Sequence, residues 1–325
     1  MITVAVAGGT SPAVGRAILV GLKQYPEQLK PVVLGRVTSE TPKWLLDMGI
    51  EVRKVDYSSE DSLISALRDV HTVICTLLAK DGTWASTQIN LLNASLKAGV
   101  SRFAPAEFGC GALAAPKVAL LSPQIAVIDA CREAKRLHPE FEYAGFHVGL
   151  FMNYLAYGGP NELEALNGLN DRVEFIWHIK DMRAEIPLTK DGDIPRMTFT
   201  EIGDVGRMTA AACLLSKGEW QEDFGMEGET ARMDEVVRVI ETVSGGKMTV
   251  TFKPFEQVVR EKNEETDPYK KFWKELEMMC ARDVIGEGIV APILNEVLKK
   301  SGLNVQPPNS IKDWCMNIFK ISAGG

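Results

Sequence analysis

Glycines that could serve a chemical purpose stand near the start of the chain. Gly8 and Gly9 end a short apolar run, and Gly15 comes just before a helical pattern. A strand, a tight turn and a helix in this order can hold a nucleotide's pyrophosphate at the helix N-terminus, because residues without Cβ let phosphate approach the main chain. The spacing is longer than the usual G-x-G-x-x-G, and such turns also serve only to pack a helix on a strand. The turn therefore favours a nucleotide site without establishing it.

A cation ends the second apolar run. In dinucleotide-binding folds an acid at this place binds the ribose 2′-hydroxyl, whereas Arg36 favours a 2′-phosphate through its charge and its planar set of donors. Thr38 and Ser39 offer hydroxyl groups to the same phosphate, and the alternative for Arg36 is a solvated surface arginine. Asp56, which ends the third run, is interpreted either as a contact to the adenine end of the cofactor or as a turn carboxylate. The pattern predicts NADP(H).

Three titratable residues are candidates for proton transfer. Glu107 follows the fifth apolar run, where a half-buried carboxyl could act as acid or base or could anchor the loop instead. His147 lies in the sixth run, where a lone histidine is more often a core residue. Lys117 belongs to the stretch 109–123, expected to be a flexible loop, from which it could move in as a proton donor or stay solvated.

The elements that would position these residues alternate along the chain. Six short apolar runs alternate with amphipathic stretches, which predicts a parallel sheet with helices on both faces. Ligands bind such sheets at the carboxyl ends of the strands, where this sequence places Gly8, Arg36, Asp56, Thr76 and Glu107. The apolar runs occupy residues 1–7, 31–36, 51–56, 71–76, 100–105 and 143–148, and the amphipathic stretches 16–23, 59–69, 83–98 and 122–137. Residues 170–171 and 191–193 are predicted turns.

Composition excludes several classes of function. The 325 residues are 46% hydrophobic, enough for a large core, and the net charge of −7 without a basic run argues against a nucleic-acid partner. No apolar stretch reaches membrane-spanning length, and glycines and a proline interrupt any signal peptide at 1–23. The 6 cysteines are scattered and the 4 histidines are unpaired, so we expect reduced thiols, no metal and a cytoplasmic protein.

Several segments together carry a resemblance to a family. The stretch 102–109, Arg-Phe-Ala-Pro-Ala-Glu-Phe-Gly, resembles the atypical short-chain dehydrogenases of the NmrA-like and isoflavone reductase-like group, as do the glycine turn, 33–36, 149–154 and 199–212. The resemblance covers nearly the whole chain, is closest to fungal members, and is loose over 255–325. It implies an α/β fold, with a Rossmann-like doubly wound parallel sheet at 1–156 and a smaller α+β substrate domain at 157–325. It also implies that the segment 195–216 packs back on the first domain.

The resemblance also implies a set of site residues. It places the nicotinamide-side ribose beside Thr76 and Leu77, and the nicotinamide ring near Phe151; Phe108, Asn153 and Tyr154 are the expected substrate contacts. Together with the residues discussed above, the predicted NADP(H) contacts are Gly8, Gly9, Thr10, Ser11, Ala13, Val14, Gly15, Arg36, Thr38, Asp56, Thr76, Leu77 and Phe151.

The chain departs from the family in two places. The glycine turn at 8–15, called the phosphate loop from here on, is one residue longer than the corresponding loop of the family. The isoflavone reductase-like enzymes carry a catalytic lysine near the start of the helix that precedes the sixth strand, and the corresponding stretch 122–131 contains none; no tyrosine has a lysine four residues later either. Glu107, His147 and Lys117 are the candidates to replace that proton donor.

Three functions are compatible with these features. The first is an NADPH-dependent reductase of a hydrophobic aromatic or polycyclic small molecule in secondary metabolism. The second is a non-redox cyclase, isomerase or rearrangement enzyme on the same scaffold, and the third is an NADP(H)-sensing regulator. The predicted helix at 267–281 is rich in aromatic residues and methionine. It is interpreted either as core or homodimer contact, or as a wall over an apolar substrate. Gly286 and Gly288 suggest a break in the next helical pattern, and so a mobile flap.

Overall fold

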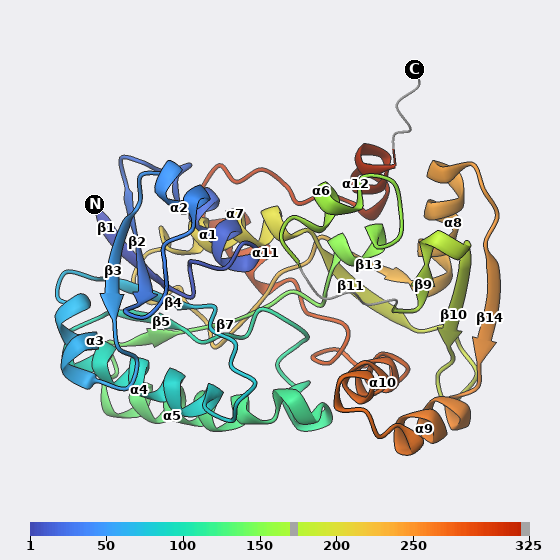
Figure 1. Ribbon diagram of the computed structural model, residues 1–325, viewed down its shortest axis with the longest axis horizontal. Coiled ribbons are helices and arrows are strands. Elements are labelled where there is room, and N and C mark those ends of the chain that lie inside the picture. Colours follow the sequence, from blue (N-terminus) through green and yellow to red (C-terminus); the bar gives the residue numbers. More distant parts are fainter. Residues whose placement is uncertain (170–174, 320–325) are drawn as a thin grey trace.

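The computed structural model describes residues 1–169 and 175–319 and contains a six-stranded parallel sheet (Figure 1). The strand order is β3-β2-β1-β4-β5-β6, the order of the Rossmann fold. The predicted α/β class and doubly wound parallel sheet are thereby confirmed. The strands are β1 (Ile2–Ala7), β2 (Leu29–Arg36), β3 (Glu51–Val55), β4 (Thr72–Cys75), β5 (Arg102–Ala104) and β6 (Glu142–Tyr143).

Helices cover both faces of this sheet because its central strands are apolar on both sides. Val4 and Val6 of β1 pack into one buried cluster, and Ala5 and Ala7 pack into another. The second cluster is closed by α3 (Glu60–Ala66), α4 (Trp84–Lys97) and α5 (Pro123–Leu137). The first is closed by α1 (Val14–Leu22), α2 (Lys43–Asp47), α7 (Ile202–Ala212) and α11 (Ile293–Ser301).

Helix α7 lies against α1 at backbone distance, although some 190 residues separate the two helices. A Cβ atom added to Gly206 would lie 2.1 Å from the carbonyl oxygen of Ala17, and one on Gly21 would lie 2.3 Å from that of Gly206. Only glycine permits such an approach. The segment predicted at 195–216 to pack on the first domain contains this helix.

The chain returns to the sheet a second time, beside the sixth apolar run. That run is divided at Ala144 into β6 and β7 (Gly145–His147), and β7 pairs in parallel with β12 (Asp223–Gly225). In this register Asp223 lies opposite Gly145. Strand β12 therefore brings a late segment of the chain to the edge where His147 ends its strand.

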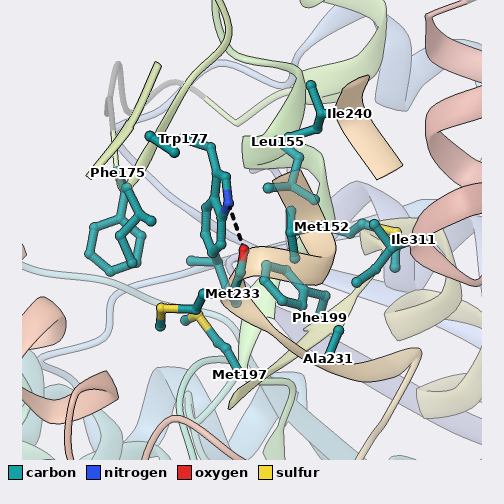
Figure 2. Packing of buried hydrophobic residues seen from close by; sticks show 14 of the residues in the cluster. Met152, Leu155, Phe175, Trp177, Met197, Phe199, Ala231, Met233, Ile240 and Ile311 are labelled. Carbon is teal, nitrogen blue, oxygen red and sulfur yellow. Dashed lines mark hydrogen bonds between the residues drawn. The ribbon is translucent and has the colours of Figure 1, made fainter. Parts of the chain in front are cut away.

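The remaining elements form a second unit with its own core (Figure 1). Figure 2 shows Trp177 at its centre, where the indole N–H donates to the carbonyl oxygen of Met233 at 3.3 Å, among Met152, Leu155 and Phe199. One three-stranded sheet contains β9 (Trp177–His178), β10 (Arg183–Pro187) and β14 (Thr249–Lys253). The other contains β8 (Leu150–Phe151), β11 (Arg196–Thr200) and β13 (Glu229–Arg232). The helices are α6 (Glu162–Leu166), α8 (Met233–Ser244), α9 (Phe255–Glu264), α10 (Pro268–Cys280) and α12 (Ile311–Ile318).

Two segments expected to be flexible are held by backbone hydrogen bonds. The stretch 109–123 contains the 3₁₀ helices η1 (Ala115–Lys117) and η2 (Ala119–Leu121). The amide of Gly111 donates to the carbonyl of Glu287 at 2.7 Å, and that of Leu113 donates to Gly286 at 2.6 Å. The glycines at 286 and 288 do interrupt helical structure, but the expectation of a mobile flap is wrong, because the turn is bonded to the loop that follows β5.

Within the described residues, no helix is long and apolar enough to cross a membrane, and no group of three or more potential ligands could hold a metal ion. The turn predicted at 170–171 lies outside those residues.

Candidate functional site

A cavity of about 440 Å³ lies where the two units meet, at the carboxyl ends of β1, β4 and β5. The first unit contributes the phosphate loop, the turn after β4 and the stretch after β5. The second unit contributes Phe151, Tyr154 and aromatic residues of α10. Ligands bind Rossmann-like sheets at this edge, so the cavity lies where the fold directs cofactor and substrate.

A second cavity, of about 260 Å³, lies beside the opposite ends of β4, β5 and β6. Its buried charges are already paired: Arg102 and Glu142 bond at 2.8 Å, and Arg102 also donates to the carbonyl of Ser216 at 2.8 Å. A cation whose donors are used within the chain is a structural feature, so the functional site is the larger cavity.

The phosphate loop has the shape that a pyrophosphate requires. Gly8 has φ of +82°, and a Cβ there would lie 2.7 Å from Thr76 Oγ1; a Cβ on Gly15 would lie 2.6 Å from the carbonyl oxygen of Gly8. Ala13 occupies the N-cap of α1 and offers no side-chain acceptor. The amide of Arg16 donates to the carbonyl of Ser11 at 3.0 Å, and the amides of Val14 and Gly15 are left for a ligand at the start of the helix. An uncapped helix N-terminus behind a glycine turn is a ready anion site.

The extra loop residue is accommodated by the second unit. Gly168 has φ of +89°, and a Cβ on it would lie 2.2 Å from the carbonyl oxygen of Pro12. The longer loop therefore extends toward the second unit, and Ser11, Ala13 and Val14 line the cavity. Gly9 packs on Val33 instead, and Gly8, Gly9, Thr10 and Gly15 form the turn without lining the cavity.

The strand-end residues of β2 and β3 lie outside the cavity. Arg36 and Thr38 are exposed after β2, where a 2′-phosphate could reach them. Asp56 accepts hydrogen bonds from the hydroxyl and the amide of Ser58, at 2.6 and 2.9 Å, and these bonds hold the pKa of its carboxyl below the usual range. The turn interpretation of Asp56 thus accounts for its contacts.

The turn after β4 is fixed by two hydrogen bonds. Thr76 Oγ1 donates to the carbonyl of Ala7 at 3.1 Å, and the indole of Trp84 donates to the carbonyl of Leu77 at 2.7 Å. Thr76, Leu77 and Trp84 all line the cavity. Phe151 faces them from β8, where its ring makes an edge contact with Tyr154 at 6.3 Å between centroids.

Glu107 lines the cavity as part of a cluster of three titratable side chains. His147 Nε2 lies 3.3 Å from Glu107 Oε2, and His147 Nδ1 lies 2.7 Å from Asp223 Oδ1. The imidazole is buried, the Glu107 side chain is 12% exposed, and that of Asp223 is 34% exposed. The cluster therefore leads from the cavity wall, through a buried histidine, to a carboxylate in contact with solvent.

Both carboxylates act on the charge of the histidine. Burial alone lowers the pKa of His147, but the hydrogen bonds and charges of Asp223 and Glu107 outweigh it and raise the pKa to about 9. At neutral pH the ring is an imidazolium that can donate from both nitrogens. A Cβ on Gly145 would lie 2.8 Å from His147 Cε1, so glycine at that position makes room for the ring.

Two further predicted site residues, Lys117 and Asn153, do not line the cavity either. Lys117 is exposed on η1 and does not line it. Asn153 is buried; its amide donates to the carbonyl of Ala165 at 2.8 Å, and its oxygen accepts from the amide of Ile202 at 2.9 Å. These bonds give Asn153 a structural role at the start of the second unit. Phe108 and Tyr154, the other predicted substrate contacts, do line the cavity.

The helix where the resemblance implies a lysine presents a glutamine. Gln124, near the start of α5, lines the cavity, and its side-chain oxygen accepts from Gln88 Nε2 at 2.9 Å while its own amide donates to the carbonyl of Ala106. Among the described residues, the charged side chains that line the cavity are Glu107 and Lys80. Nothing in the sequence pattern singled out Lys80, whose Nζ lies 5.9 Å from the ring centroid of Tyr269.

Helix α10 packs into a core with one part of its surface and lines the cavity with another. Leu276 and Met279 pack into the core of the second unit, while Tyr269, Phe272 and Trp273 line the cavity. Trp273 makes edge contacts with Tyr154 at 6.2 Å and with Phe272 at 5.0 Å between centroids. The cavity therefore has an aromatic wall opposite the phosphate loop.

The fold and the cavity define a Rossmann-type protein with a cofactor cleft, and comparison with known proteins narrows the class. The model of the NmrA-like family matches residues 3–272, and the chain belongs to that family.

Similar proteins include reductases. The oxidoreductase swnN of Metarhizium robertsii is 35% identical over 116 residues, a match that spans only 33% of this chain and 31% of that protein. The structure of AtPrR2 with NADP+ and (+)pinoresinol has a TM-score of 0.72 at 17% identity, covering 98% of both chains. That of isoflavone reductase has a TM-score of 0.70 at 18% identity, covering 98% of this chain and 99% of the other.

Proposed function

We propose that this protein is an NADPH-dependent reductase of an aromatic or polycyclic small molecule, serving secondary metabolism. One observation carries the proposal: a single cavity joins the uncapped N-terminus of α1 to an aromatic wall, and Glu107 lines the same cavity. A reductase of this class needs all three parts, one to hold the cofactor, one to hold an apolar substrate and one to supply a proton.

The residues of the first unit fit NADP(H). The glycine turn and the free amides of α1 would hold the pyrophosphate, and the exposed Arg36 at the end of β2 would pair with the 2′-phosphate. Thr76, Leu77 and Phe151 would contact the nicotinamide half. The similar protein AtPrR2 binds NADP+ in a fold that matches this chain over nearly its whole length, which supports the assignment.

The cofactor, when bound, supplies a hydride to an electrophilic carbon of the substrate. The electron pair displaced from the reacting double bond collects on a heteroatom, which must then be protonated. Glu107 is the side chain of this chain that we assign to that step, because it lines the cavity and is hydrogen-bonded to a charged histidine. Lys117 is exposed and does not line the cavity, and we assign it no part.

The substrate would be a largely apolar, planar molecule. The aromatic wall of Tyr269, Phe272 and Trp273 favours stacking and edge contacts with aromatic rings. The cavity of about 440 Å³ is of the size that small ligands occupy. The similar structure of AtPrR2 contains (+)pinoresinol together with NADP+, which supports a small-molecule substrate.

The proposal is tested by binding followed by turnover. NADPH, NADP+ and NADH are titrated by fluorescence, and quinones, enones and iminium compounds are then screened for loss of the near-ultraviolet absorbance of NADPH. Tight NADPH binding with oxidation by at least one acceptor is the expected result. Failure to bind NADPH would overturn the cofactor assignment, and binding without oxidation by any acceptor would overturn the reductase.

A second candidate is favoured by the Glu107–His147–Asp223 cluster itself. Two carboxylates on one buried imidazolium can move a proton without any hydride, as a cyclase or isomerase requires. In that case NADP(H) would be bound without being oxidised. Turnover of a substrate at a constant NADPH concentration would distinguish this enzyme from the reductase.

A further inference from the structure

The cluster beside the cavity extends beyond the residue that faces the substrate. Asp223 comes from β12, which reaches this place because it pairs with β7 in parallel, and its carboxylate accepts from His147 Nδ1 at 2.7 Å. The opposite ring nitrogen faces Glu107 Oε2 at 3.3 Å. A carboxylate that holds one imidazole nitrogen fixes the direction and the protonation of the other.

Other titratable groups near the cluster include Glu222, which is paired elsewhere, and two neutral thiols. Glu222, next to Asp223, forms an ion pair with Arg132 of α5, in which Arg132 Nη2 lies 2.6 Å from Glu222 Oε1. Cys131 is buried and Cys110 is half-buried, and burial raises the pKa of both thiols, so they stay neutral. Glu107 Oε1 is buried and has no hydrogen-bond partner in the described part of the chain. The carboxyl group thus has one oxygen bonded to the histidine and one that is unpaired.

We propose that Asp223 and His147 are positioning residues that hold a transferable proton against Glu107: Asp223 orients the imidazolium so that its Nε2 proton is shared with the carboxylate oxygen Oε2 of Glu107, through which it can pass to the substrate. This inference rests on the proposed function and adds two residues to it. As hydride reaches the substrate carbon, the displaced electron pair moves to the substrate heteroatom, which takes the shared proton from Glu107. Glu107 is left as carboxylate and His147 as the neutral Nδ1–H form donating to Asp223; one proton from solvent restores the pair after product release.

The charge arrangement is tested first, without any substrate. Histidine-labelled protein is titrated by NMR, and among the 4 histidines the His147 signal is assigned by its loss in His147→Gln. In Asp223→Asn the amide oxygen still accepts from Nδ1, but the negative charge is gone. We expect the His147 signal to titrate near pH 9 in the wild type and at least about one unit lower in the variant. Glu222→Gln is the matched control and should leave the titration unchanged.

The positioning role is tested by the pH dependence of kcat, with phenanthrenequinone and then the other acceptors of the oxidation screen. The shared proton is present below the pKa of the pair, so kcat falls on the alkaline side. In Asp223→Asn that fall should move to lower pH by at least about one unit, with NADPH affinity unchanged. A merely structural defect would lower kcat equally at every pH. If the wild type oxidises NADPH and its kcat falls at the same alkaline pH as that of Asp223→Asn, the positioning proposal alone is overturned. If the wild type shows no turnover, the proposed function is overturned and this inference with it.

Discussion

The phosphate loop and the Glu107 cluster lie at the carboxyl edge of the same sheet, but they are built from different parts of the chain. The loop is made of backbone: two glycines with no room for Cβ and a helix that begins at Val14 without a cap. The cluster is made of side chains from β7, β12 and the stretch after β5, which are far apart in sequence. The first site comes from one continuous segment, residues 8–15, whereas the second is assembled from three separate segments of the chain.

The difference suggests how the two sites can change independently. A backbone site binds the phosphates that every NADP(H) carries, so its chemistry is fixed by the cofactor. A side-chain site can exchange one proton donor for another while the sheet stays the same. In this chain the start of α5 carries no lysine, and Gln124, which lines the cavity there, has its amide bonded within the protein. Variants that affect one site without affecting the other test this separation.

The largest effect is expected from Glu107→Gln. The amide keeps the size and a hydrogen bond to the histidine but cannot pass on a proton, so kcat should fall by about 10²–10⁴-fold. NADPH affinity should not change, because the phosphate loop is untouched. Steady-state kinetics and NADPH titration check both parts, with the exposed Glu140→Gln as control. An equal loss of cofactor binding would show that the two sites are not separate.

The charged histidine should make stability depend on pH. The pKa of His147 is raised in the folded state to about 9 from an ordinary value of 6.5, so its stabilisation is complete below about pH 6.5 and is lost as pH rises through about 9. The free energy of unfolding should therefore decrease over this window by up to about 3 kcal/mol more in the wild type than in His147→Gln. Urea denaturation at a series of pH values measures it; parallel pH curves for the two proteins would contradict the assignment of the charge.

The cofactor side is tested by Arg36→Ala. Losing one charge-assisted contact to the 2′-phosphate should weaken NADPH binding by about 10–100-fold and leave NADH binding as it was. The exposed Arg68, which follows α3, gives a control variant of equal charge, Arg68→Ala. Fluorescence titration of each variant with NADPH and with NADH measures the affinity for both cofactors. If NADPH and NADH were weakened alike, Arg36 would have no part in selecting the phosphate.

The smallest effect is expected at the aromatic wall. Trp273→Leu removes a ring that contacts Tyr154 and Phe272, and such aromatic contacts contribute about 0.5–1.5 kcal/mol each. The KM for an aromatic acceptor should rise by about 3- to 10-fold while the Kd for NADPH stays constant. Phe252→Leu, at an exposed aromatic residue of β14, is the control. An unchanged KM would place the substrate elsewhere in the cavity.

The sequence predicts the local parts of this molecule well. Alternating apolar runs locate all six strands of the sheet, and the helix predicted at 267–281 coincides with α10. Glu107 could be selected because the carboxyl end of a strand is a place where ligands bind. Gly286 and Gly288 correctly predicted a break in helical structure, but not the backbone bonds that hold the turn in place.

What the sequence could not predict depends on tertiary contacts. Asp223 had no local signal, since it meets His147 only through the pairing of β12 with β7, 76 residues apart. Asn153 was predicted as a substrate contact, whereas the structure gives it hydrogen bonds to Ala165 and Ile202. These bonds form only in the folded chain, so the sequence could not show them. Lys117 was a candidate because a sequence does not show that its side chain is exposed on η1 and does not line the cavity.

The central claim is that cofactor and substrate meet in the cavity between the phosphate loop and α10. The most direct measurement is to supply NADPH carrying deuterium on C4 of the nicotinamide, in each of its two stereochemical forms, with an enone or iminium acceptor that the protein reduces, because the product of a quinone would lose the label to solvent. The account predicts that the product gains one deuterium on carbon from one of the two forms and none from the other. Product without deuterium from either form, or NADPH that binds and is never consumed, would contradict it.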